Sequence, residues 1–212
     1  IGWWMVSSGL QGGMLDVASY RLAIHLGWAF LILGYLSWML LQLGHAPRNI
    51  PWEENDSMFI ERLLRFFVVL VFCQVCIGAL VSGIDAGKSY TDWPLMAGEL
   101  IPSELFVVAG DGIGILENPA FVQFFHRTIG YCLAFLGLFI WYKVQTLSKA
   151  KSENRFNVFI GLIFLQILVG IFTLLASAPI SFAIIHQSGA ILLFLYSVWL
   201  LFQLQRKSAK TS

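Results

Sequence analysis

Long apolar runs, separated by polar segments and one long loop, dominate the pattern of this sequence. Five of them reach about 20 residues or more, the length that an α-helix needs to cross the apolar part of a bilayer. We predict membrane helices over residues 20–43, 59–84, 120–145, 156–175 and 181–205. The opening run, residues 1–8, is apolar but too short to span, so we expect it to be the end of a sixth helix.

The loop over residues 85–119 differs from the other connections. It is long and rich in Gly and Pro, and it also carries large apolar side chains such as Trp93 and Phe106. Loops of this length are usually functional or disordered. Its apolar content favours a segment that folds over the membrane surface.

Basic residues are divided unequally between the two ends of the predicted helices. Alternating the helices across the membrane puts ten of the 13 Lys and Arg residues at one end, and Arg21, Lys88 and Arg127 at the other. Because basic residues are retained on the cytoplasmic side, the first end faces the cytoplasm or the mitochondrial matrix. The long loop therefore faces outward.

Composition agrees with an all-α polytopic membrane protein. The chain is 58% hydrophobic and 12% charged, whereas soluble domains carry about 25% charged residues. The formal net charge is +1, and no basic run or base-stacking arrangement indicates a nucleic-acid partner. The chain begins at Ile1 inside an apolar run and shows no signal peptide, so we expect a truncated or processed form.

Three cysteines, Cys73, Cys76 and Cys132, all lie in apolar segments. The first two have the CxxC spacing of zinc and redox sites, but they fall in the middle of a predicted membrane helix. We interpret them as small packing residues one turn apart. No disulfide is expected in the loops.

Histidines supply the candidate chemistry. His25, His126 and His186 each lie five or six residues inside the outer end of a predicted helix, which is a depth of roughly 8 Å. Ionisable groups inside a membrane are costly and by default mark a functional site. His45 differs, because it lies at the inner end beside Pro47, and we interpret it as an interfacial residue.

Two imidazoles at equal depth on facing helices can bind a metal from opposite sides. We predict that His126 and His186 are the axial ligands of a haem iron, since neutral imidazole is a common haem ligand. The alternative is that each is a hydrogen-bonded packing residue. A structural zinc site is disfavoured because zinc takes four ligands, and no carboxylate or cysteine lies at that level.

Arg127 follows His126 directly, so on a helix it points about 100° away from the ligand direction. Its guanidinium can reach the outer interface, where a haem propionate would lie. It can equally extend to lipid headgroups. Both interpretations remain open at this point.

A weak internal repeat links the start of the chain to its end. Residues 1–9, IGWWMVSSG, resemble residues 169–177, VGIFTLLAS, and each segment is followed by a helix with a histidine near its start. The repeat predicts a protein of eight helices in two four-helix halves. Residues 1–58 would be the remainder of the first half, and residues 59–212 the second half.

Several segments together resemble the haem A synthase family. They are VSGIDAGKSYTDWPLMAGELIP, ENPAFVQFFHRTIGY, LVGIFTLLASAP and HQSGA, with IGWWMVSSGL and YRLAIHLG at the start. The resemblance covers essentially the whole chain and is closest to the class without cysteine pairs in the outer loops. It departs from the family mainly in lacking the upstream helices.

This resemblance implies eight membrane helices in two pseudo-symmetric four-helix bundles. It implies a b-type haem in the C-terminal half, with His126 and His186 as axial ligands. It also implies that the N-terminal half oxidises a ring methyl of haem O to the formyl group of haem A, with His25 as one of a catalytic histidine pair that ligates haem iron. Haem O synthase and cytochrome oxidase assembly are the implied partners, in a bacterial cell membrane or the mitochondrial inner membrane.

Two other classes of function compete with this interpretation. A bis-His electron-transfer cytochrome b would hold haem without modifying it, but it normally has histidines near both faces of the membrane. A transporter would use the histidines to line a polar path and would show no haem spectrum.

Overall fold

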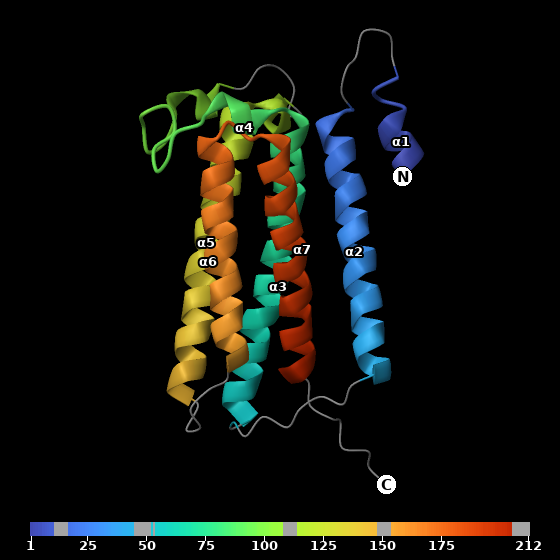
Figure 1. Ribbon diagram of the computed structural model, residues 1–212, viewed down its shortest axis with the longest axis vertical. Coiled ribbons are helices and arrows are strands. Elements are labelled where there is room, and N and C mark those ends of the chain that lie inside the picture. Colours follow the sequence, from blue (N-terminus) through green and yellow to red (C-terminus); the bar gives the residue numbers. More distant parts are fainter. Residues whose placement is uncertain (11–16, 45–51, 53, 108–113, 148–153, 205–212) are drawn as a thin grey trace.

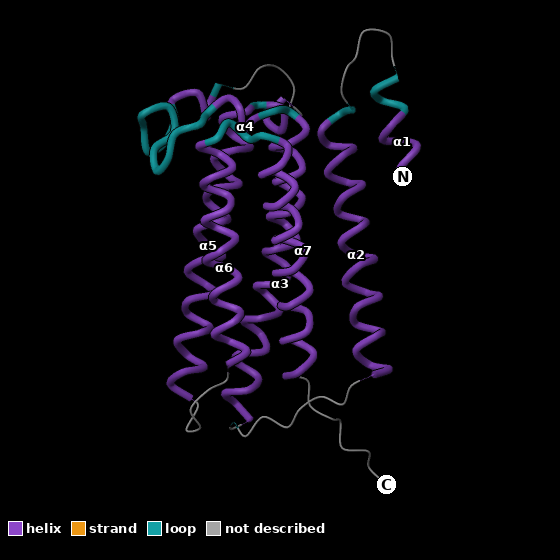
Figure 2. The backbone as a smooth tube through the Cα atoms, viewed as in Figure 1, coloured by secondary structure: helices purple, strands orange, loops and turns teal. Residues whose placement is uncertain are grey.

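The computed structural model describes all residues except 11–16, 45–51, 53, 108–113, 148–153 and 205–212. In that part of the chain the elements are helices joined by loops, without strands (Figure 2). The long helices are α2 (Ser19–Gly44), α3 (Glu54–Gly83), α5 (Pro119–Leu147), α6 (Asn154–Leu175) and α7 (Ile180–Leu204). They run side by side along the longest axis of the molecule (Figure 1).

Shorter elements gather at one end of these helices. α1 (Gly2–Val6) packs beside α2. The loop between α3 and α5 contains α4 (Ala86–Ser89) and two 3-10 turns, η1 (Ser103–Phe106) and η2 (Gly114–Glu117). This loop lies across the end of the bundle where α5 and α7 begin (Figure 1). The predicted helix end over residues 1–8 corresponds to α1.

The prediction of five membrane helices is confirmed, since the described part of the chain contains five helices that are long and apolar enough to cross a membrane. Most of their ends agree with the predicted ends within one or two residues. The exception is α3, which begins at Glu54 rather than at residue 59. Its first turn is polar and includes Asp56, whose negative charge suits the positive N-terminal end of a helix. A hydropathy pattern does not detect such a polar extension.

Four of the helices form a bundle. α3 packs against α5 and α7, and α6 packs against the same two helices. α5 and α7 therefore occupy opposite corners of the bundle, as do α3 and α6. α2 packs on the outside against α3 and α7. The assignment of residues 59–212 to one half of an eight-helix protein stays a prediction.

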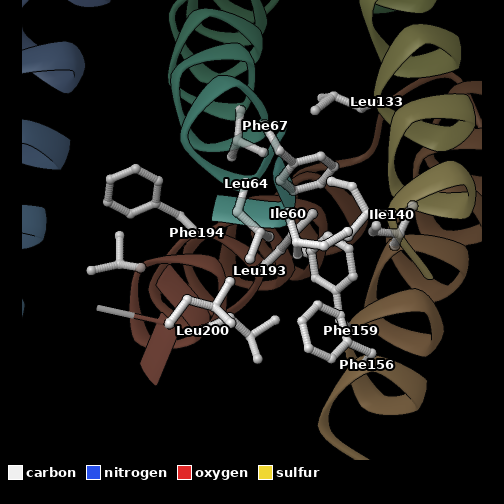
Figure 3. Close-up of a cluster of buried hydrophobic side chains, with 14 of the residues drawn as sticks. Ile60, Leu64, Phe67, Leu133, Ile140, Phe156, Phe159, Leu193, Phe194 and Leu200 are labelled. Carbon is white, nitrogen blue, oxygen red and sulfur yellow. The ribbon is translucent and has the colours of Figure 1, made fainter. Parts of the chain in front are cut away.

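The buried core of the bundle lies toward the end away from the α3–α5 loop. Ile60, Leu64 and Phe67 lie on one face of α3 and are 0% exposed. Phe67 packs edge-on against Phe159 of α6, with ring centroids 4.9 Å apart, and Ile140 of α5 closes the cluster (Figure 3). These contacts join three helices at the inner end.

The outer end is packed differently. Among the described residues of α6, the buried ones stop at Ile163, and in α7 they begin only at Leu193. The outer parts of both helices thus carry no fully buried side chain. Within the described residues, the buried side chains at this end belong instead to α3 and α5, for example Ala79 and Val122.

Replacing Phe67 by alanine tests the core. We expect Phe67→Ala to lower the free energy of unfolding by on the order of 2 kcal/mol, because packing contacts are lost. The loss is smaller than in a water-soluble protein, because lipid is about as apolar as the protein core and burial in the core gains little over exposure to lipid. Phe66→Ala, at a side chain that is 59% exposed, is the matched control and should change little. Unfolding of the purified protein by detergent titration measures both, and equal effects would contradict this account of the core.

Candidate functional site

His126 and His186 face each other across the outer end of the bundle. His126 lies at the start of the third turn of α5 and His186 in the second turn of α7, the two helices at opposite corners. Their ring centroids are 6.4 Å apart, and the rings are inclined at 72°. Neither ring has a carboxylate partner among the hydrogen bonds of the described residues. The two side chains that the sequence indicated as a pair are therefore neighbours.

This spacing can be compared with that of a metal bound between two imidazoles. A metal about 2 Å from each ring nitrogen puts the two ring centroids about 6 Å apart. Two buried atoms, Nδ1 of His126 and Oε1 of Gln74, have no hydrogen-bond partner within the described residues. Such atoms cost free energy unless a further group satisfies them. The spacing of the two rings and the unpartnered Nδ1 of His126 fit a metal held between the two histidines.

Two glutamines that the sequence analysis did not single out contact these histidines. The Nε2 of Gln74 on α3 donates a hydrogen bond of 2.9 Å to the backbone oxygen of His126 and lies 3.4 Å from the ring nitrogen Nε2. The Nε2 of Gln166 on α6 donates one of 2.8 Å to the backbone oxygen of His186 and lies 3.2 Å from Nδ1. Each histidine is thus held by an amide of the preceding long helix.

Glycine follows each glutamine by one helical turn and faces the same imidazole. A Cβ placed on Gly78 would lie 3.1 Å from Cε1 of His126, and one on Gly170 would lie 2.9 Å from Cε1 of His186. Any larger residue there would push the imidazole away. The spacing Gln-x-x-x-Gly occurs on both helices, and this repeat was the sequence signal that could have revealed the glutamines.

His25 occupies a related position on α2, outside the bundle. A Cβ on Gly2 of α1 would lie 3.5 Å from its Cε1, which is an ordinary contact and less close than at Gly78 and Gly170. Within the described residues its neighbour is α1 rather than a second histidine ring. The catalytic and iron-binding role of His25 stays a prediction, and His45 lies outside the described residues.

Arg127 holds the outer loop. Its guanidinium donates hydrogen bonds to the backbone oxygens of Tyr90 (3.2 Å), Asp92 (3.0 Å) and Leu95 (2.9 Å). Gln123, one turn earlier on α5, also donates to the Tyr90 oxygen, at 2.9 Å. The loop is therefore fixed to the helix that carries His126. A role for Arg127 in contacting a haem propionate stays a prediction.

Charged groups shape the same loop. Asp92 accepts hydrogen bonds from the backbone N–H groups of Gly98 and Ala97, and the Gly98 bond above all lowers the pKa of its carboxyl. Burial raises the pKa of Tyr90 to about 12, and the hydrogen bond that its hydroxyl donates to Glu104 acts in the same direction. Both groups keep their usual charge at neutral pH, so the loop has a fixed electrostatic structure.

The remaining polar candidates have local roles. Asp85 stands at the start of α4 with φ 53° and pairs with Lys88 at 2.8 Å, so its role is local to this turn. Cys76 is half-buried and its Sγ lies 3.2 Å from a Cβ placed on Gly27, whereas Cys73 is exposed. Cys76 is thus a packing residue between α3 and α2.

Fold and site together define a multi-pass helical membrane protein in which helices at opposite corners of a bundle bring two histidines together. The model of the COX15-CtaA family, described as cytochrome oxidase assembly protein, matches residues 1–198. The chain belongs to this family.

Curated relatives agree with this assignment. Proteins named heme A synthase from Jannaschia sp. (strain CCS1) and Dinoroseobacter shibae are 43% and 42% identical to this chain, over 193 and 192 residues. These alignments cover 91% and 90% of this chain but 51% and 50% of the relatives. The chain therefore spans about half the length of the curated relatives that it matches. No solved structure matches it.

Removing the Arg127 guanidinium should loosen the loop. In Arg127→Gln we expect the amides of residues 96–99 to exchange with solvent at least about tenfold faster, because a single hydrogen bond from a charged group contributes about 1.5 kcal/mol or more. Hydrogen exchange followed by mass spectrometry of the protein in lipid measures this. Arg62→Gln, at an exposed residue near the opposite end, is the control, and equal exchange in both variants would contradict the anchoring role.

Proposed function

We propose that this chain is the C-terminal part of a haem A synthase, which oxidises a ring methyl of haem O to the formyl group of haem A within the membrane. The observation that supports this most is the His126–His186 pair, 6.4 Å between ring centroids, in a chain of this family. The relatives that carry the name are about twice as long. The activity is therefore proposed for the whole protein.

In this proposal, a b-type haem lies between the two imidazoles. Its iron and porphyrin supply the redox chemistry when bound. His126 and His186 provide neutral nitrogen donors from opposite sides, and Gln74 and Gln166 hold them in place. Arg127 keeps the outer loop over this end of the bundle, which limits the access of water.

His25 is proposed to belong to the separate site where haem O reacts. It lies on α2, which packs on the outside of the bundle against α3 and α7. A reaction site there would be adjacent to the haem-holding bundle rather than inside it. A second ligand would then come from another part of the whole protein.

The substrate, the location and the partners are proposed from the family and the fold. Haem O is the substrate and haem A the product, and lipids cover the apolar outer faces of the helices. Because the relatives are bacterial, the location is the bacterial cell membrane. Haem O synthase and the cytochrome oxidase assembly machinery are the proposed partners, and the electron acceptor is left unassigned.

An electron-transfer cytochrome b is the second candidate. The observation that favours it is the His126–His186 pair itself, because a haem held between two imidazoles is sufficient for electron transfer. Such a protein would carry the same haem but leave haem O unchanged.

Three histidine variants of the full-length protein separate these functions. We expect His126→Ala and His186→Ala each to abolish the b-type signal in a reduced-minus-oxidised spectrum, because each removes an axial ligand. His25→Ala should keep that signal but stop the conversion of haem O to haem A, measured by chromatography of extracted haems. An unchanged spectrum in both of the first two variants would refute the haem site, and full conversion by His25→Ala would favour the cytochrome.

A further inference from the structure

We propose that Gln74 and Gln166 are positioning residues that set the orientation of His126 and His186 through two equivalent seats, each made of a glutamine amide and a glycine one turn later. The inference rests on the proposed function, because it concerns the same two ligands. It adds the residues that decide how those ligands are presented.

The first contact of each seat is a hydrogen bond whose direction is unambiguous. A backbone oxygen can only accept, so the group that Gln74 turns toward the His126 oxygen at 2.9 Å is its NH₂. The same holds for Gln166 and the His186 oxygen at 2.8 Å. Each bond ties the helix that bears the histidine to its neighbour at the histidine itself. Rotation or sliding of that helix would break it.

The second contact acts on the imidazole. Residues four apart on a helix share a face, so Gly78 and Gly170 lie beside the same rings as their glutamines. The amide nitrogen stands 3.4 Å from Nε2 of His126 and 3.2 Å from Nδ1 of His186, so the seats are equivalent in their partners but touch different ring nitrogens. A Cβ on either glycine would lie about 3 Å from Cε1 of the ring, 3.1 Å at Gly78 and 2.9 Å at Gly170. Each ring is thus confined between an amide and a bare stretch of backbone.

The two seats occupy equivalent places in the bundle. They lie on α3 and α6 at opposite corners, and they serve α5 and α7 at the other two corners. Each seat therefore directs its imidazole from one side toward the middle of the bundle. Equivalent seats explain how two histidines from helices that are not adjacent come to the same depth.

A general cross-linking role for the amides is the alternative. Hydrogen bonds between membrane helices each contribute modestly to their association, so a glutamine could simply join two helices. Gln145 provides the comparison within this chain. Its Nε2 joins α5 to Asn157 of α6 at 3.1 Å, near the inner end and away from both histidines. A general role predicts that Gln74, Gln166 and Gln145 respond alike to substitution.

The test uses the purified full-length protein with its haem. Gln74→Leu and Gln166→Leu are compared with Gln145→Leu, and Gly170→Ala is compared with Gly161→Ala, where a Cβ meets nothing within 4 Å. The readouts are the g values of the low-spin haem in electron paramagnetic resonance, its midpoint potential, and the rate of haem loss to apomyoglobin. Gln74→Asn and Gln166→Asn, which withdraw the amide by one methylene, serve where a leucine variant does not fold.

We expect the Gln74, Gln166 and Gly170 variants to shift the g values and the potential and to lose haem about tenfold faster, since partners that orient metal ligands typically contribute tenfold or more in affinity. The Gln145 and Gly161 variants should match the unmodified protein. Unchanged g values in both Gln74→Leu and Gln166→Leu would overturn the proposal.

A haem-free measurement separates this inference from the proposed function. In protein with ¹⁵N-labelled histidine and no haem, Gln74→Leu should move the ring resonances of His126, and Gln166→Leu those of His186, while Gln145→Leu moves neither. If the full-length protein shows no bis-His signal but these resonances move, the proposed function fails and the seats stand. If the resonances stay in place, the seats fail.

Discussion

Packing at the inner end of the bundle is the constraint on which the rest of the structure depends. Phe67 of α3, Phe159 of α6 and Ile140 of α5 interlock there with almost no exposed surface. In a membrane, water does not drive helices together, so close packing and hydrogen bonds between helices must hold them. The packed inner end fixes the directions of the helices and leaves the outer end free to carry polar groups.

The outer end uses hydrogen bonds where the inner end uses apolar contacts. Gln74 and Gln166 hold the histidine-bearing helices, and Arg127 holds the loop that lies across their ends. Each of these groups bonds to a backbone oxygen, so each fixes a segment of chain rather than another side chain. Gly87 of the loop also lies against Ala178 in the turn before α7. Loop, ligands and helices thus form one connected unit around His126 and His186.

Much of this arrangement followed from the sequence because a membrane restricts what a chain can do. Long apolar runs had to be helices, and a histidine such as His126 stood out because polar groups at that depth are costly. The glutamines were missed because an amide can also be an ordinary helix contact, and only the shared spacing to Gly78 and Gly170 distinguishes them. The contacts of Arg127 could not be foreseen, because every residue has a backbone oxygen and the residue types of a loop do not show which oxygens accept hydrogen bonds. The early start of α3 escaped for a similar reason, because its polar first turn resembles a loop.

The central claim is that a single iron lies between His126 and His186. X-ray absorption at the iron edge tests it most directly when the purified full-length protein carries His25→Ala, which removes a ligand of the separate haem O site, and is compared with the same protein that also carries His186→Ala. The account predicts two axial imidazole nitrogens at about 2 Å in the His25→Ala protein and the loss of one of them in the double variant. Two imidazole ligands that persist in the double variant, or an iron without imidazole ligands in the His25→Ala protein, would contradict it.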